Sequence, residues 1–254
     1  GVGGEDKIAV ITHEGWADDA GPIASISRRL SWTALERLSN IIAVEVSRLL
    51  RGESAATLRG KPRLALLAAN SGEWLTAAIA ASVAGVVLVP LNTRWSPREM
   101  ADTLADSGAV MVLHDGGARA TMLDRVFDVL SKDYCGVGIA KTSGGGAVVR
   151  HNLQWALHIT PHNDNNELKD WQLSATHLTK VGAVSREKGA ATGAAAAAAL
   201  DIISPLAQGP PAETFTFMYT SGTTGQPKGA MHSHCAHVVQ IDAKIATRTL
   251  TAAG

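Results

Sequence analysis

Residues 63–115 read RLALLAANSGEWLTAAIAASVAGVVLVPLNTRWSPREMADTLADSGAVMVLHD, and this stretch decides the fold class. Its three short apolar runs, at residues 63–69, 86–89 and 110–114, have the length of buried β-strands. Two segments of helical character separate these runs. Strands that alternate with helices over short connections form a parallel sheet that helices cover on both faces. The stretch therefore predicts an α/β fold.

Capping residues mark where the two helices of this stretch begin. Asn70 or Ser71 can cap a helix over residues 73–83. The sequence Ser-Pro-Arg-Glu at residues 96–99 combines an N-cap serine, a proline at the first helical position and a glutamate at the third. We expect this second helix to run to about residue 107, where a glycine follows.

Upstream of this stretch, residues 33–50 have the periodicity of an amphipathic helix. Thr33 and Glu36 have the spacing of a capping box, in which each side chain accepts a hydrogen bond from the other residue's backbone N–H. Apolar residues then recur at helical spacing, and Gly52 supplies a stop. The sequence predicts a helix that begins at Thr33.

The composition changes over residues 142–212. Three consecutive glycines occupy residues 144–146, a polar run occupies 162–166, and a tract of glycine and alanine occupies 189–199. Such diluted apolar patterns are typical of surface segments. We therefore interpret 142–212 as an insertion or poorly ordered segment within a single partial domain that comprises residues 1–254.

A loop rich in glycines and hydroxyls follows, in the sequence TFMYTSGTTGQPKG at residues 216–229. Glycine lets the backbone curl so that its N–H groups face an anion. The loop also offers one cation, Lys228, and four hydroxyls that suit a polyphosphate, on Thr220, Ser221, Thr223 and Thr224. It is not a Walker loop, because Pro227 stands where that loop has its second glycine. Ser233 or His234 then caps a last predicted helix, over about 235–248.

The sequence YTSGTTGQPKG closely resembles the phosphate-binding signature of the AMP-forming, adenylate-forming superfamily, to which acyl-CoA synthetases, aryl–CoA ligases and luciferases belong. The resemblance covers roughly residues 31–115 and 214–245. It implies an incomplete N-terminal domain of the adenylate-forming fold, with a parallel αβα subdomain, truncated after the phosphate loop. Within the superfamily, residues 91–96 (LNTRWS) resemble the corresponding part of plant-type o-succinylbenzoate–CoA ligases, and they also resemble that of medium-chain and aromatic acid ligases.

The resemblance implies roles for individual residues. The loop would hold the β- and γ-phosphates of ATP through a cradle made of Thr220, Ser221, Gly222, Thr223, Thr224, Gly225 and Lys228. Lys228 would also act in catalysis by neutralising the charge that develops on pyrophosphate. His234 falls where the family has a Ser/Thr-His pair beside the acyl pocket, which implies a contact with the substrate. A histidine that merely begins a helix is the alternative for His234.

The implied activity is that of an ATP-dependent acid–CoA ligase. A carboxylic acid and ATP, with Mg²⁺, would give an acyl-adenylate and pyrophosphate, and coenzyme A would then take the acyl group. The family's later motifs follow the phosphate loop, whereas this chain ends 25 residues after Gly229 (254 − 229). We therefore expect the chain alone to be inactive. The alternatives are a non-catalytic product that binds nucleotide weakly or acts through protein contacts, and an unrelated phosphate-binding module.

The composition argues against several other classes. The 23 basic and 23 acidic residues give a formal net charge of zero, so no basic patch predicts a nucleic-acid partner. No apolar run reaches the length of a transmembrane helix. Cys135 and Cys235 lie too far apart in sequence for a metal-type pair. The histidines at 232, 234 and 237 have a spacing that suits a cluster at a helix start better than a metal site, so we predict no metal site. A soluble protein of a reducing compartment fits: cytoplasm, plastid stroma or peroxisome matrix.

Overall fold

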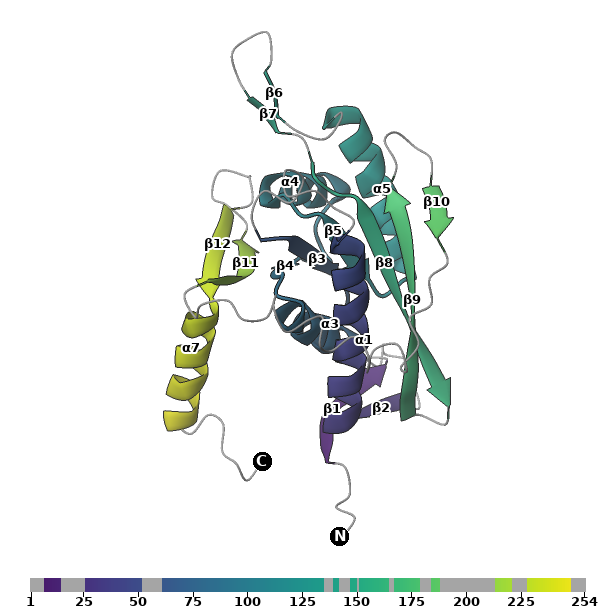
Figure 1. The fold of residues 1–254 in the computed structure, drawn as a ribbon, viewed down its shortest axis with the longest axis vertical. Helices are drawn as coiled ribbons and strands as arrows, with labels where there is room; N and C mark the ends of the chain where they lie inside the picture. Colours follow the sequence, from purple (N-terminus) through teal and green to yellow (C-terminus); the bar gives the residue numbers. More distant parts are fainter. Residues whose placement is uncertain are drawn as a thin grey trace, which may run out of the picture.

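A computed structural model of the chain describes residues 7–14, 26–51, 61–134, 139–141, 147–149, 151–164, 167–178, 184–187, 213–220 and 228–247. The helices and strands follow one another along the chain as drawn in Figure 1. In order they are β1 (Ile8–Glu14), β2 (Ile26–Ser31), α1 (Trp32–Leu50), β3 (Arg63–Leu67), α3 (Gly72–Val83), β4 (Val87–Pro90), α4 (Pro97–Ser107), β5 (Met111–His114), α5 (Ala118–Asp133), β6 (Ile139–Lys141), β7 (Ala147–Val149), β8 (Trp155–Asp164), β9 (Glu167–Leu178), β10 (Val184–Glu187), β11 (Thr214–Thr220), β12 (Lys228–Ser233) and α7 (His234–Ala246).

One large sheet organises these elements. Its strand order is β1-β2-β9-β8-β5-β3-β4-β11-β12, with β10 paired to β9. The five neighbours β8, β5, β3, β4 and β11 are parallel, whereas β11 pairs with β12 and β8 pairs with β9 in antiparallel fashion. The prediction of an α/β fold around a parallel sheet is confirmed.

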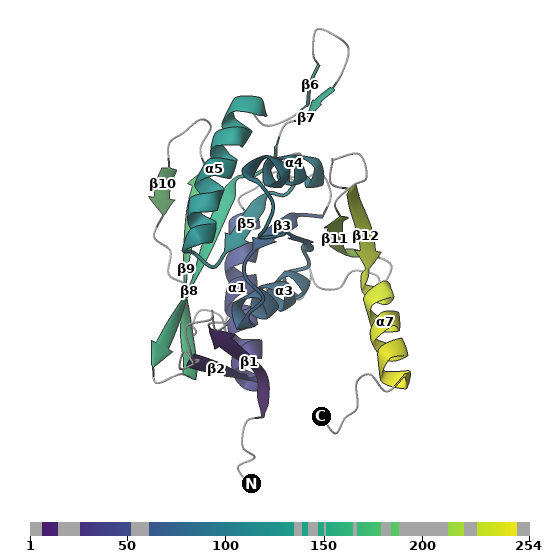
Figure 2. The same ribbon diagram turned by 180° about the vertical axis from the view of Figure 1, so that it is seen from behind.

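Helices cover both faces of the parallel strands, as the opposite views in Figures 1 and 2 show. On one face, α1 and α3 pack against a cluster that includes Leu64 and Leu66. On the other face, α4 and α5 pack against a cluster that includes Ala65 and Leu67. Successive side chains of a strand point to opposite faces. Both faces of β3 are therefore buried, which explains its unbroken apolar sequence.

The capping signals predict three of the helix starts correctly. Ser233, one of the two predicted caps of the last helix, caps α7 by accepting a hydrogen bond from the Ala236 backbone N–H at 3.1 Å. Ser71 caps α3 by accepting a hydrogen bond from the Trp74 backbone N–H at 3.3 Å. Ser96 and Glu99 form the predicted capping box of α4: the Ser96 hydroxyl accepts from the Glu99 backbone N–H at 3.3 Å, and the Glu99 carboxylate accepts from the Ser96 backbone N–H at 2.8 Å. At the other end of α4, Gly108 adopts a φ of +63°, which ends the helix.

The predicted capping box at Thr33 and Glu36 is wrong. The N-cap of α1 is Ser31, whose hydroxyl accepts a hydrogen bond from the Ala34 backbone N–H at 3.2 Å. β2 ends at Ser31, and α1 follows it directly at Trp32, one residue before Thr33. The Trp32 backbone N–H, which has no partner within the helix, donates to the Lys7 carbonyl at 3.1 Å. Thr33 consequently lies inside the first turn, where it cannot act as the cap.

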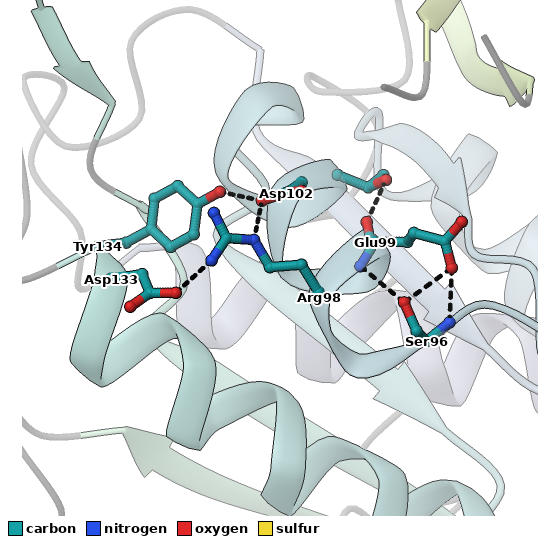
Figure 3. A network of polar contacts seen from close by, with 7 residues as sticks. Ser96, Arg98, Glu99, Asp102, Asp133 and Tyr134 are labelled. Carbon is teal, nitrogen blue, oxygen red and sulfur yellow. Dashed lines mark hydrogen bonds and ion pairs between the residues drawn. The ribbon is translucent and has the colours of Figure 1, made fainter. Parts of the chain in front are cut away.

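A polar network fixes α4 against the end of α5 (Figure 3). The Arg98 guanidinium donates to Asp102 at 3.0 Å within α4 and also reaches Asp133 at the end of α5. The hydroxyl of Tyr134, which follows α5, donates to the same Asp102. Burial and this hydrogen bond raise the pKa of Tyr134 to about 12. The two helices are therefore tied at their polar ends as well as through the apolar cluster between them.

Part of the segment 142–212 belongs to the central sheet. β8 pairs with β5 from Trp155 to His158, and Leu157 and Ile159 are fully buried. The sequence leads us to expect an insertion or poorly ordered segment here. The apolar stretch of β8, from Trp155 to Ile159, is short and has polar residues on either side, so it gives only a weak strand signal. Residues 188–212 lie outside the described residues. The boundaries of the domain remain a prediction.

Candidate functional site

The predicted phosphate loop is carried by the hairpin of β11 and β12. In its register Thr214 faces Ser233 at one end, and Thr220 faces Lys228 at the other. β11 is also parallel to β4, through Thr216 and Leu88. Thr220 therefore stands at the carboxyl end of a parallel strand, and ligands of open α/β sheets bind at that edge.

The structure brings the first and last members of the predicted cradle together. Directly opposed residues of an antiparallel pair have Cα atoms about 4.5–5.5 Å apart and side chains on the same face. The Thr220 hydroxyl and the Lys228 ammonium therefore share one face, and both residues are exposed. Within the described part of the chain, Lys228 forms no ion pair. The other cradle residues lie outside the described residues: Ser221, Gly222, Thr223, Thr224 and Gly225.

The pair next to Thr220 and Lys228 is Tyr219 with Gly229. The Tyr219 ring lies across Gly229, where an added Cβ would approach the ring carbon Cζ to 2.8 Å. The Tyr219 hydroxyl donates a hydrogen bond of 2.6 Å to Asp106, near the end of α4. Burial, and then this carboxylate, raise the pKa of Tyr219 well above its ordinary value. The phenol therefore keeps its proton and remains a hydrogen-bond donor.

Two residues farther back, Phe217 makes a second contact with the same region. The guanidinium carbon of Arg63 lies 4.9 Å from the centre of the Phe217 ring, and Arg63 also donates to the Ser107 carbonyl at the end of α4. Phe217 and Tyr219 both pack against the apolar cluster under α4 and α5. One face of β11 is thus docked on the carboxyl end of α4.

His234 lies at the opposite end of the hairpin. It follows Ser233, the cap of α7, whereas Lys228 begins β12, so the strand rise of about 3.3 Å per residue places them roughly 20 Å apart. The His234 ring stacks on Phe215 with ring centres 4.6 Å apart. Burial and the nearby Lys61 lower its pKa. The structure does not bring His234 to Thr220 or Lys228, the two cradle residues that it describes. Its contact with a substrate remains a prediction.

The neighbouring histidines make contacts with the hairpin. His237 lies 3.0 Å from the Thr216 hydroxyl through Nε2, and its ring centre is 5.8 Å from that of His232. Among the residues that the structure describes, no group of three or more histidine, cysteine or acidic side chains could hold a metal ion. None of the described helices is long and apolar enough to span a membrane.

A histidine pair occupies the same carboxyl edge of the sheet, on β5 and β8. The His114 and His158 rings stack with centres 4.9 Å apart. His114 Nδ1 accepts a hydrogen bond from the Gly116 backbone N–H at 3.1 Å. Burial, and then His158, lower the pKa of His114 to about 4. Beside the pair, Asp115 binds Arg119 and also accepts from the Ala69 backbone N–H at 3.0 Å.

Sequence reasoning missed Asp106 and the part that Tyr219 plays. The alternation of β11 could have placed Phe217 and Tyr219 on one face. Asp106, however, is one of several carboxylates on α4 and carries no local signal. Only the packing of β11 against α4 reveals its contact with Tyr219.

Comparison with known proteins gives a family match and several partial relatives, among them a feruloyl-CoA synthase and a fatty-acid–CoA ligase. A family model described as AMP-binding enzyme matches residues 6–252. A feruloyl-CoA synthase of an Amycolatopsis species is 42% identical over 69 residues, which are 27% of this chain and 14% of that protein. The long-chain-fatty-acid–CoA ligase FadD13 of Mycobacterium tuberculosis is 29% identical over 172 residues, which are 68% of this chain and 24% of that protein. The chain thus matches less than a third of the length of either relative.

Solved structures give weaker likenesses. The o-succinylbenzoate CoA synthetase of Bacillus subtilis in complex with AMP has a TM-score of 0.48 and 20% identity, and the match covers 88% of this chain and 41% of that one. A fatty acyl CoA synthetase of Mycobacterium tuberculosis has a TM-score of 0.45 and 20% identity, covering 81% of this chain and 29% of that one. Likenesses at this level do not bear on function.

Proposed function

Because the chain belongs to the family of AMP-binding enzymes, we propose that it supplies the phosphate-binding part of an ATP-dependent acid–CoA ligase. In the proposed reaction a carboxylate attacks the α-phosphate of MgATP. An acyl-adenylate forms and pyrophosphate leaves. The thiol of coenzyme A then takes the acyl group and AMP leaves. The substrates are thus a small carboxylic acid, MgATP and coenzyme A.

The observation that carries this proposal is the pairing of Thr220 with Lys228. Seven residues join these two, and three of them are hydroxyl residues and two are glycines. The Thr220 hydroxyl and the Lys228 cation therefore lie side by side, at the two ends of the connection formed by residues 221–227. The pair lies at the carboxyl edge of the sheet, where α/β proteins bind nucleotides.

In the proposal each residue has a separate task. Thr220, Ser221, Thr223 and Thr224 donate hydroxyl hydrogen bonds to oxygens of the β- and γ-phosphates, and Gly222 and Gly225 let backbone N–H groups approach them. Lys228 balances the negative charge that grows on the leaving pyrophosphate, as a preorganised cation does most effectively in the transition state. His234 contacts the acid and not the phosphates, consistent with its distance from Lys228.

The names of the relatives suggest which classes of carboxylic acid to test as substrates. One relative is a feruloyl-CoA synthase and another a long-chain-fatty-acid–CoA ligase. The lead from residues 91–96 adds o-succinylbenzoate. A panel of aryl, fatty and succinylbenzoate acids therefore covers the proposed substrates.

The test is acid-dependent exchange of labelled pyrophosphate into ATP, which requires the adenylate and not coenzyme A. We measure it with the 254-residue chain and with the longest protein that contains it. We expect exchange in the longer protein and none in the chain alone, since the chain matches less than a third of its relatives' lengths. Exchange by the chain alone would refute the expected inactivity. The absence of exchange with every acid in the longer protein would refute the ligase assignment.

The matched pair of variants is Lys228→Ala and Lys132→Ala. Both remove an exposed lysine, but Lys132 lies on α5, away from the hairpin. Loss of a group that stabilises transition-state charge lowers the rate by about 100-fold or more. We expect that loss for Lys228→Ala and no change for Lys132→Ala. ATP binding without exchange in the longer protein would favour the non-catalytic alternative.

A further inference from the structure

The Tyr219–Asp106 contact joins the hairpin to the body of the domain one residue from the proposed phosphate contacts. Tyr219 precedes Thr220, and its ladder partner Gly229 follows Lys228. The Tyr219 ring lies across Gly229, so a single side chain touches both strands of the hairpin at this point. Its hydroxyl ends 2.6 Å from Asp106. Asp106 is thus linked to Thr220 through the hydrogen bond to Tyr219, the Tyr219 ring and the peptide bond between Tyr219 and Thr220.

The hairpin has few other attachments near this end. β11 pairs with β4 at Thr216, four residues before Thr220, and the Phe217–Arg63 contact lies three residues before it. Residues 228–232 of β12 are exposed, and in the described part of the chain β12 has no further strand on its outer side. Beyond Phe217, the described structure therefore holds the hairpin end to α4 through Tyr219.

Asp106 is carried by a helix that is itself firmly held. α4 begins with the capping box of Ser96 and Glu99, and it buries Met100 and Leu104 completely. Its polar face is tied to the end of α5 through Arg98 and Asp133 (Figure 3). Asp106 thus offers Tyr219 a fixed point of attachment.

We propose that Tyr219 and Asp106 are positioning residues that set the place of Thr220 and Lys228 for binding polyphosphate, and that Gly229 is glycine so that the Tyr219 ring can cross it. The proposal rests on the proposed function, because it assigns these residues to the same phosphate site. Neither residue touches phosphate in this account. Their effect passes through the backbone of the hairpin.

The test compares two Tyr→Phe variants that each remove one hydrogen bond to an aspartate of α4. Tyr219→Phe removes the bond to Asp106 and keeps the ring over Gly229. Tyr134→Phe removes the bond to Asp102, on the side of α4 that faces α5. If a general loosening of α4 weakens phosphate binding, both variants will show the loss. If the position of the hairpin end is what matters, only Tyr219→Phe will show it.

The measured quantity is the dissociation constant of inorganic tripolyphosphate, by titration calorimetry on the full chain with Mg²⁺ present. We expect Tyr219→Phe and Asp106→Ala to weaken binding by roughly five- to tenfold. This is less than the full contribution of a hydrogen bond to a carboxylate, because the effect reaches the phosphate through the backbone of the hairpin. We expect Tyr134→Phe to bind as the wild type does. Asp106→Asn keeps an oxygen that can accept from Tyr219, and we expect it to restore most of the affinity.

The outcomes separate this inference from the proposed function. A wild-type chain that does not bind tripolyphosphate refutes the phosphate site and, with it, this inference. A wild type that binds while Tyr219→Phe binds equally well refutes the inference alone. Equal weakening in Tyr219→Phe and Tyr134→Phe also refutes it, because the cause would then be α4 as a whole. Thermal unfolding of each variant, run beside the titrations, establishes that every compared protein is folded at the temperature of measurement.

Discussion

Acidification should destabilise this fold through one buried histidine. Burial, His158 and Arg119 together lower the pKa of His114 to about 4, against the opposing effect of Asp115. In the unfolded chain the same imidazole has a pKa near 6.5. Between these two values the unfolded state binds the proton and the folded state does not. The stability linked to His114 is therefore complete above about pH 6.5 and is lost as the pH falls to about 4.

The size of the effect follows from the two pKa values. A difference of one pKa unit corresponds to about 1.4 kcal/mol, so the gap between 6.5 and about 4 corresponds to roughly 3 kcal/mol of the free energy of unfolding. His158 adds to the loss, because burial also lowers its pKa. Since small domains are stable by only about 5–15 kcal/mol, a loss of this size is a large share of the total.

The assay is urea denaturation at a series of pH values from 7 to 4, for the wild type and His114→Asn. The asparagine oxygen can take the place of Nδ1 and accept the hydrogen bond from the Gly116 backbone N–H, but it does not titrate. We expect the variant to lose roughly 3 kcal/mol less than the wild type over this range. Identical pH dependence in the two proteins would refute the argument, because His114 would then not be the group that resists protonation.

Three further predictions concern the core, a helix cap and the hairpin. Leu66→Ala removes a fully buried side chain of β3 and should cost about 2–5 kcal/mol of unfolding free energy, measured by urea denaturation. Ser96→Ala removes the cap of α4 and should cost about 1 kcal/mol in the same assay, whereas an unchanged stability would show that the Ser96–Glu99 capping box does not hold the helix. Gly229→Ala places a methyl group against the Tyr219 ring and should weaken tripolyphosphate binding in calorimetry; an unchanged affinity would contradict the need for glycine there.

The central part of the fold could be predicted because its signals are local. β3 is apolar on both faces, and α4 carries a complete set of start and stop signals in Ser96, Glu99 and Gly108. Where two signals compete, the sequence misleads. Thr33 has the spacing of a capping box, but Ser31 lies at the end of β2 and caps the helix first.

Other elements lack such signals. α5 begins after Gly117, which provides no side-chain hydrogen bond, and only Leu123, Val126 and Leu130 are buried along its length. Nothing local marks its start, so the sequence analysis does not predict it. β8 joins the sheet through its pairing with β5, a contact between segments about 40 residues apart that no local pattern encodes.

The candidate site divides in the same way. A motif of adjacent residues predicts the hairpin end, and the structure pairs Thr220 with Lys228. The contact of Tyr219 with Asp106 joins residues separated by 113 positions, so it depends on the packing of β11 against α4. His234 illustrates the limit of the motif, because it lies near Lys228 in sequence and far from it along β12.

The central claim is that this hairpin binds the phosphates of a nucleotide through Lys228. The most direct measurement is the dissociation constant of MgATP for the wild-type chain and for Lys228→Ala, by titration calorimetry at one salt concentration. The account predicts binding by the wild type and a loss of about tenfold in the variant, because a lysine about 4 Å from a phosphate charge contributes roughly 1 kcal/mol in water and roughly 4 kcal/mol at the effective dielectric of a protein surface. Equal affinity of the two proteins for MgATP would contradict it.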